Sequence, residues 1–238
     1  MTTQDQEKHN KEIVKKSKQE VAKQSDKPRG FENEDAKDLL LPRVELLQGL
    51  SPAVQEGKGT AGDLVNQISK TPLPTEYFVP ITMQRRYIKW IPRDQGGGVE
   101  YQTSDPTDKR VIEDIKWGSH GEKPSCTAYM NFLILLEEQT LPIVLSFSMT
   151  NYQEGRKLYT MCKMANCDIW LKRYKVGTKA KTNNMGTWHV FDISEAGDAS
   201  KENAAMAEKL YHSFGKTQFN VDLDATTTKV PADKDEDF

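Results

Sequence analysis

Residues 127–148 read TAYMNFLILLEEQTLPIVLSFS, and this stretch decides the fold. It holds two apolar runs, TAYMNFLILLEE and LPIVLSFS, which are separated by the short Glu138–Gln139–Thr140 link. Apolar runs of this length that lack polar alternation are typical of strands buried on both faces. The stretch therefore predicts two neighbouring strands in the middle of a sheet.

The segments on either side supply the remaining elements. Apolar residues recur at spacings of three and four after Thr150, which predicts an amphipathic helix. Residues 168–176 and 187–194 then predict two strands, and the polar residues 177–186 between them predict the turn of a hairpin. Upstream, residues 77–91 are rich in aromatic and β-branched residues and predict the first strand, which a long loop over 92–124 follows.

The predicted order is one strand, a long loop, two strands, a helix and a two-strand hairpin. This is the layout of an oligonucleotide-binding (OB) fold, so we expect a mainly β (α+β) chain built on an OB-like five-stranded barrel with a helix between strands 3 and 4. Another small α+β domain would give the same order.

The chain divides by composition into four segments. Residues 1–30 are lysine-rich and predict a flexible arm, and residues 31–74 predict a helical or extended segment that precedes the core, with a helix starting at Asp63. Residues 75–215 form the expected OB-like core, which ends in a helix over 200–214 with Gly215 as its stop. Residues 216–238 predict an acidic, flexible tail.

Composition narrows the class of protein. The sequence lacks both a membrane-spanning apolar run and the apolar stretch of a signal peptide. Its three cysteines, Cys126, Cys162 and Cys167, suit a reducing compartment better than a disulfide framework. We therefore expect a cytoplasmic protein, in the host cytoplasm if it is viral.

Two stretches combine basic and aromatic residues. Residues 156–181 contain eight basic residues and one acid, and a second group surrounds Tyr87 and Trp90 without any acid. Cations that follow phosphates and rings on which bases stack are what single-stranded binding requires. The predicted nucleic-acid-binding residues are Arg85, Arg86, Tyr87, Lys89, Trp90, Arg93, Trp170, Lys172, Arg173, Tyr174, Lys175, Lys179 and Lys181.

The C-terminus is the second distinctive feature. Residues 221–238 contain six acids and two lysines, and the chain ends in Asp235, Glu236, Asp237 and Phe238. An acidic segment of this kind can occupy a basic groove of its own chain, and a terminal aromatic can enter a partner's pocket while the acids meet its basic rim. We expect these four residues to bind a partner protein.

A basic OB-like core followed by an acidic tail that ends in DKDEDF resembles the single-stranded DNA-binding proteins of bacteriophage and bacterial replication. The resemblance covers the architecture and about six terminal residues. It implies sequence-tolerant coating of single-stranded DNA, with RNA also open, in DNA replication or recombination. It also implies recruitment of replication or recombination proteins through the tail, and a homo-oligomer is compatible with it.

Other classes of function remain as alternatives. The chain could be a regulatory or protein-interaction factor whose tail binds a polymerase, or a viral structural component. We do not expect an enzyme, a cofactor or a catalytic residue, because His120 and His189 have no nucleophile context. Cys162 and Cys167 with His189 lack the second close ligand pair of a zinc site, so no metal is predicted either.

Overall fold

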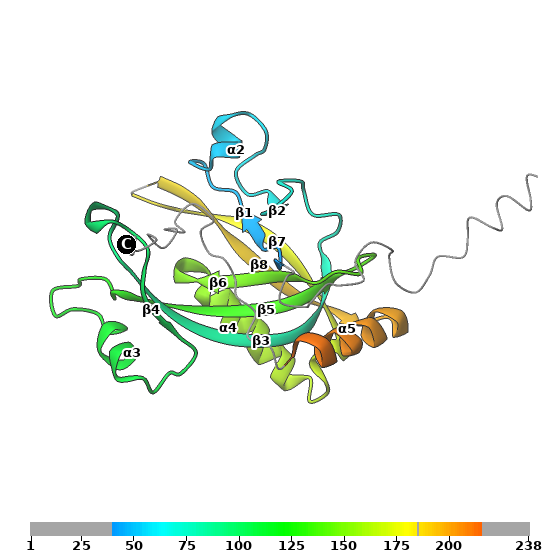
Figure 1. The fold of residues 1–238 in the computed structure, drawn as a ribbon. Coiled ribbons are helices and arrows are strands. Elements are labelled where there is room, and N and C mark those ends of the chain that lie inside the picture. Colours follow the sequence, from blue (N-terminus) through cyan, green and yellow to red (C-terminus); the bar gives the residue numbers. More distant parts are fainter. Residues whose placement is uncertain (1–39, 185, 216–238) are drawn as a thin grey trace, which may run out of the picture. The chain divides into compact units, whose positions relative to one another are not determined.

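The computed structural model describes residues 40–184 and 186–215. Except for Leu40, all of these residues belong to one compact unit, which begins at Leu41. Its main feature is an antiparallel sheet of six strands with the order β6-β5-β3-β7-β8, in which β4 also pairs with β3 (Figure 1). The strands are β3 (Tyr77–Trp90), β4 (Val99–Thr103), β5 (Cys126–Leu136), β6 (Ile143–Ser148), β7 (Lys172–Asn183) and β8 (Gly186–Asp198). A second sheet pairs β1 (Val44–Leu46) with β2 (Leu64–Asn66).

Helices connect and cover these strands. The short ones are α2 (Pro52–Gln55) and α3 (Lys109–Asp114), with 3-10 turns η1 (Arg93–Gln95), η2 (Met149–Asn151) and η3 (Ile169–Leu171). The longer ones are α4 (Tyr152–Met164), between β6 and β7, and α5 (Lys201–Phe214), after β8. Among the described residues, no helix is long and apolar enough to cross a membrane.

The strand β3 is the centre of the sheet. It pairs with β5 along one edge from Phe78 to Lys89. Along its other edge it pairs first with β7, at Tyr77 and Phe78, and then with β4, from Tyr87 onward. A register shift between Pro80 and Thr82 interrupts the pairing with β5, as a β-bulge does.

The bulge changes which side chains share a face. Residues directly opposite each other in a ladder lie on the same face, and side chains alternate along each strand. Before the bulge Val79 pairs with Leu135, whereas after it Gln84 pairs with Asn131 and Arg85 with Met130. The odd residues of β3 therefore move from one face to the other at the bulge.

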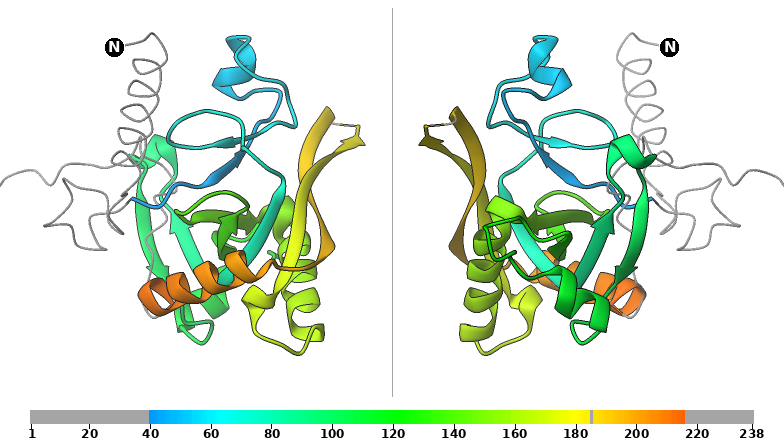
Figure 2. Two further views of the ribbon diagram at one scale, coloured as in Figure 1. Left: turned by 90° about the vertical axis from the view of Figure 1, so that its right-hand side faces the viewer. Right: turned by 90° about the vertical axis from the view of Figure 1, so that its left-hand side faces the viewer.

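Each face of the sheet has its own core. One core packs Phe132, Phe147 and Tyr174 against Leu158 and Cys162 of α4. The other packs Ile81 and Leu133 against Ala207 of α5 and contains Leu41, Val79, Leu135 and Val144. We call the face of the sheet that carries the first core the α4 face, and the face that carries the second core the α5 face (Figure 2).

The predicted five-stranded barrel is wrong. The sheet has six strands, and its outer strands β6 and β8 are not paired with each other within the described residues. Some of their outward backbone groups are bound by other parts of the chain. The Val144 N–H of β6 donates to the Pro42 carbonyl at 2.8 Å. In β8, His189 N donates to the Gln48 side chain at 2.9 Å and Phe191 N to that of Asn151 at 2.8 Å.

Several elements agree with the sequence and others do not. The helix predicted after Thr150 is confirmed as α4, and the final helix is confirmed as α5, whose N-cap is Ser200 and whose C-cap is Gly215. The helix predicted from Asp63 is wrong, because residues 64–66 form β2. The loop predicted over 92–124 contains β4 and α3, and the predicted turn over 177–186 is mostly strand, since β7 continues to Asn183 and β8 starts at Gly186 (Figure 2).

Gly155 tests the packing of α4 on the sheet. A Cβ added there would lie 2.7 Å from Cβ of Phe147. A Gly→Ala change in a helix ordinarily stabilises by about 1 kcal/mol. Here we expect Gly155→Ala to lower the free energy of unfolding by about 1–3 kcal/mol, because the core is overpacked.

Chemical denaturation of both variants against the wild type measures this effect. Gly177→Ala is the matched control, because a Cβ at that position meets only the Asp192 carbonyl at an ordinary 3.8 Å. A Gly155→Ala protein at least as stable as the wild type would show that α4 does not pack this tightly.

Candidate nucleic-acid interface

The predicted basic group around Tyr87 and Trp90 does not form one surface. Tyr87 and Lys89 pair with Ala128 and Cys126 of β5, so they share the α4 side of β3 with Arg85. Arg86, together with Trp90, lies on the opposite side of the strand. Neighbours in the sequence are therefore separated by the thickness of the sheet.

Two of the four predicted stacking rings are buried. Tyr174 has no exposed surface and lies in the α4-face core, and Tyr87 is 7% exposed and packs with Tyr101 and Val111. A ring without an exposed face cannot stack on a base. The prediction that Tyr87 and Tyr174 stack on bases is therefore wrong.

The other two rings are partly exposed but occupied. Trp90 donates its indole N–H to the Tyr129 hydroxyl at 3.4 Å. Trp170 packs beside α5, with its ring 4.8 Å from that of Tyr211. Both have partners within the fold, so a base would have to displace or share these contacts.

Four of the five cations of β7 lie in ion pairs. Lys172 contacts Asp198 at 2.6 Å, and Lys175 contacts Glu76 at 2.6 Å. Arg173 lies 3.2 Å from Glu137, and Lys179 contacts both Glu154 and Asp192. The acids reduce the charge that these side chains offer to a phosphate.

The remaining predicted cations are distributed over different elements. Arg86 is buried and donates to Gln102 at 3.1 Å. Arg93 is exposed in η1, and Lys181 is exposed near the end of β7. The predicted partner-binding residues Asp235, Glu236, Asp237 and Phe238 lie outside the described residues.

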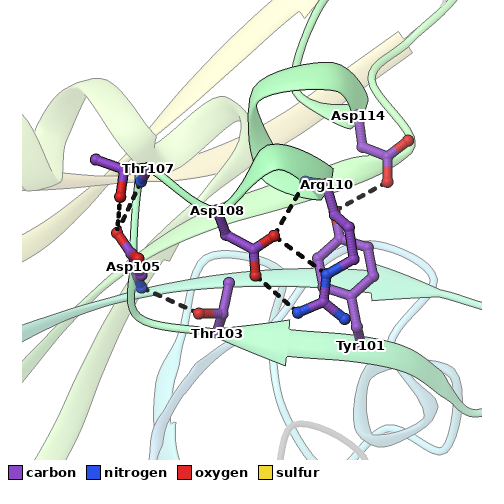
Figure 3. Close-up of polar contacts among 7 residues, drawn as sticks. All are labelled: Tyr101, Thr103, Asp105, Thr107, Asp108, Arg110 and Asp114. Carbon is purple, nitrogen blue, oxygen red and sulfur yellow. Dashed lines mark hydrogen bonds and ion pairs between the residues drawn. The ribbon is translucent and has the colours of Figure 1, made fainter.

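Lys89 belongs to a network around Asp114. Its ammonium lies 3.2 Å from Asp114 and 3.2 Å from Glu100. The Tyr101 hydroxyl donates to Asp114 at 2.9 Å (Figure 3), and the Ser125 hydroxyl donates at 3.0 Å. Although burial alone would raise it, the hydrogen bonds from Tyr101, Ser125 and Lys89 lower the pKa of Asp114.

The turn between β4 and α3 is fixed by its own contacts. Asp108 accepts hydrogen bonds from the backbone N–H and the guanidinium of Arg110, whose charge lies 4.6 Å from the centre of the Tyr101 ring (Figure 3). Asp105 accepts from the Thr107 backbone N–H at 2.8 Å. The polar residues of this segment thus hold α3 against β4.

The Asp114 network gives a stability prediction. Asp114→Ala removes the acceptor of the buried Tyr101 hydroxyl, so we expect the free energy of unfolding to fall by about 1–3 kcal/mol. Glu100→Ala removes only a more exposed partner of Lys89 and should cost about 0–1 kcal/mol. Denaturant unfolding at pH 7 measures both, and equal losses would contradict the network.

The same network predicts a pH dependence. Because the folded protein lowers the pKa of Asp114, its contribution is present above the pKa of an unfolded Asp, about 4, and is lost as pH falls through the folded value. The stability difference between wild type and Asp114→Ala should therefore shrink in acid.

The structure brings one group of cations together around a ring. The Arg85 guanidinium and the Lys163 ammonium each lie 5.8 Å from the centre of the Tyr159 ring. Arg156 precedes Tyr159 by three residues on α4, and that spacing places it on the same side of the helix. We call Arg85, Arg156, Tyr159 and Lys163 the Tyr159 cluster.

The Tyr159 cluster is accessible and free of acids. Its three cations are exposed, and Tyr159 is half-buried against the α4-face core. Within residues 40–184 and 186–215, none of the ion pairs between an acid and a lysine or arginine involves Arg85, Arg156 or Lys163. Arg156, Tyr159 and Lys163 were absent from the predicted site, although their i, i+3 and i+7 spacing on an expected helix could have singled them out.

No metal site is evident in the part of the chain that the structure describes. No three His, Cys, Asp or Glu side chains there gather as metal ligands. Cys162 is buried in the α4-face core, and burial raises the pKa of its thiol to about 11. Cys167 is exposed.

The chain was compared with known proteins. The profile of a family described as Pam3 phage gp34-like protein matches residues 9–220. No curated protein and no solved structure matches the chain.

Proposed function

The chain belongs to the Pam3 phage gp34-like family, and we propose that it is a non-enzymatic phage protein that binds single-stranded DNA through the Tyr159 cluster. Binding would be tolerant of sequence, because phosphates and the faces of bases are common to all nucleotides. The protein would act in phage DNA replication or recombination in the host cytoplasm. No cofactor takes part in this proposal.

One observation carries the proposal. The Tyr159 cluster combines Arg85 from the group around Tyr87 and Trp90 with Arg156, Tyr159 and Lys163 from residues 156–181, and its three cations are not engaged by acids of the described chain. Cations beside a partly exposed ring are the combination that single-strand binding requires. By contrast, four of the five cations of β7 already contact Asp198, Glu137, Glu76 or Glu154.

The contacts suggest how a strand would bind. Arg85 comes from β3 and Lys163 from the last turn of α4, so phosphates bound by the two cations would run from the strand to the helix. Both cations already lie within cation–π distance of Tyr159. A base attached to those phosphates would therefore meet the exposed part of this ring.

The charge prediction compares two double variants. Arg85→Ala with Lys163→Ala should weaken binding of a fluorescent single-stranded oligonucleotide on the order of tenfold at 0.1 M salt, and should reduce the slope of log K against log salt by about 1.4, because two phosphate contacts are lost. Lys172→Ala with Lys175→Ala removes the same charge from ion-paired positions and should change affinity less. Equal losses in the two variants would refute the assignment to the Tyr159 cluster.

The ring prediction concerns Tyr159 alone. Tyr159→Ala should weaken single-strand binding by about 1–3 kcal/mol if one base stacks on the ring. Tyr159→Phe keeps the stacking surface and should bind like the wild type. Thermal unfolding controls for the core contacts of Tyr159, and an alanine variant that folds and binds normally would exclude stacking here.

The tail would supply the partner contacts. We propose that Asp235, Glu236, Asp237 and Phe238 bind replication or recombination proteins, with the ring in a pocket and the acids on its basic rim. This follows from the sequence alone.

A second candidate function has its own support. Buried rings favour a regulatory, protein-interaction or viral structural role over nucleic-acid binding, and Leu50 and Trp117 are 90% and 67% exposed. Exposed apolar side chains of this kind suit a protein partner. The oligonucleotide titration separates the candidates, because a protein-binding factor would show neither single-strand affinity nor its salt dependence.

A further inference from the structure

Tyr152 shares one side of α4 with three members of the Tyr159 cluster. Tyr152, Arg156, Tyr159 and Lys163 follow one another at spacings of four, three and four residues. Residues at these spacings lie above one another on a helix, so all four side chains occupy the same side of α4. Two rings therefore alternate with two cations along the helix, and we call these four residues the α4 stripe.

The α4 stripe is separate from the other two sides of the helix. Leu158 and Cys162 mark the side that is buried in the α4-face core. The acid of α4, Glu154, contacts Lys157 and Lys179, so it lies on the side of the helix that faces β7. The stripe lies on neither of these sides, so the helix that carries its cations does not neutralise them.

The surroundings of Tyr152 are similar to those of Tyr159. Both rings are half-buried and pack against the α4-face core. Burial, and next the nearby Tyr152, raise the pKa of Tyr87, whereas Arg85 acts on it in the opposite direction. Tyr87 thus has Tyr152 and Arg85 as neighbours, and the Arg85 guanidinium lies 5.8 Å from the centre of the Tyr159 ring. A continuous set of neighbours therefore joins the two rings.

The two rings are spaced for a short nucleic-acid strand. Tyr159 follows Tyr152 by seven residues, which is a rise of about 10.5 Å along the helix. Neighbouring nucleotides of a stacked strand lie about 3.4 Å apart, so this rise equals about three steps. The two rings would therefore hold the first and the last base of about four nucleotides, and Arg156 between them would meet a phosphate.

We propose that Tyr152 is a second stacking residue, and that one single strand of about four nucleotides lies along the α4 stripe with a base on each ring. This inference rests on the proposed DNA binding and deepens it, because it names the length of the bound strand and the residue at its far end. A mononucleotide or a dinucleotide is too short to reach both rings. The bound strand must also be unpaired, because the bases inside a duplex are stacked on one another and do not offer their faces to a side chain.

The length of the oligonucleotide tests the second ring. Tyr152→Ala should weaken binding of a single-stranded tetranucleotide about 5- to 150-fold, the effect of one lost stacking contact. It should change binding of a dinucleotide little, because a dinucleotide still binds at Tyr159. Tyr152→Phe keeps the ring and should bind both like the wild type. Tyr211→Ala is the matched control, because it removes a partly exposed tyrosine from α5 and should leave both affinities unchanged.

Crosslinking locates the two bases without relying on affinity. A tetranucleotide with iodouracil at one end, irradiated in complex with the wild-type protein, should crosslink to one of the two tyrosines. A tetranucleotide with iodouracil at the other end should crosslink to the other tyrosine. Mass spectrometry of the digested protein identifies the residue in each case.

The outcomes separate this inference from the proposed function. Unchanged tetranucleotide affinity in Tyr152→Ala, in a protein whose binding still requires Arg85 and Lys163, would overturn the second ring and leave the proposed function standing. A wild-type protein that binds no single-stranded oligonucleotide would overturn both. If Tyr152→Ala does not fold, Tyr152→Leu, which keeps apolar packing without an aromatic ring, takes its place, and the crosslinks of the wild-type protein remain decisive.

Discussion

The pairing of β3 with three other strands is the constraint on which the rest of the structure depends. One strand of 14 residues carries β5 along one edge and β7 and β4 in succession along the other. Its register therefore fixes the positions of both cores and of the polar groups beyond them. The bulge between Pro80 and Thr82 is the critical detail, because without it Arg85 and Arg86 would exchange faces.

Local elements could be predicted from the sequence because their signals are local. The apolar runs of 127–148 identify β5 and β6, and the spacing of Leu158 and Cys162 identifies α4. The contacts that cover the outer edge of β8 were not predictable in this way. One of them joins Gln48 to His189 across 141 residues, and no propensity in either segment encodes that contact. The short elements β4 and α3 were missed because Gly96–Gly98 and the SDPTD turn dominate the composition of their segment.

The candidate binding residues were harder to predict than the local elements of the fold, and the reason is electrostatic. The basic residues of β7 form a run in the sequence, but Glu76, Glu137 and Glu154, which pair with them, come from elsewhere in the chain. A count of charged residues along one stretch of sequence includes the cations of β7. It misses the acids that neutralise them, because these acids lie in other segments. Tyr159 and Lys163 could have been selected by their spacing on α4, whereas the contribution of Arg85 required the β3 register.

The alternation of a strand also gives adjacent residues of this fold different surroundings. Arg85 is exposed beside a ring on the α4 face, and Arg86 is buried among amides and hydroxyls on the α5 face. An exposed cation exchanges water and counterions easily, which suits a ligand that must bind and leave along its length. A buried guanidinium in fixed hydrogen bonds instead favours one acceptor geometry. Two adjacent residues of the same type therefore differ in solvation, because they lie on opposite faces of the sheet.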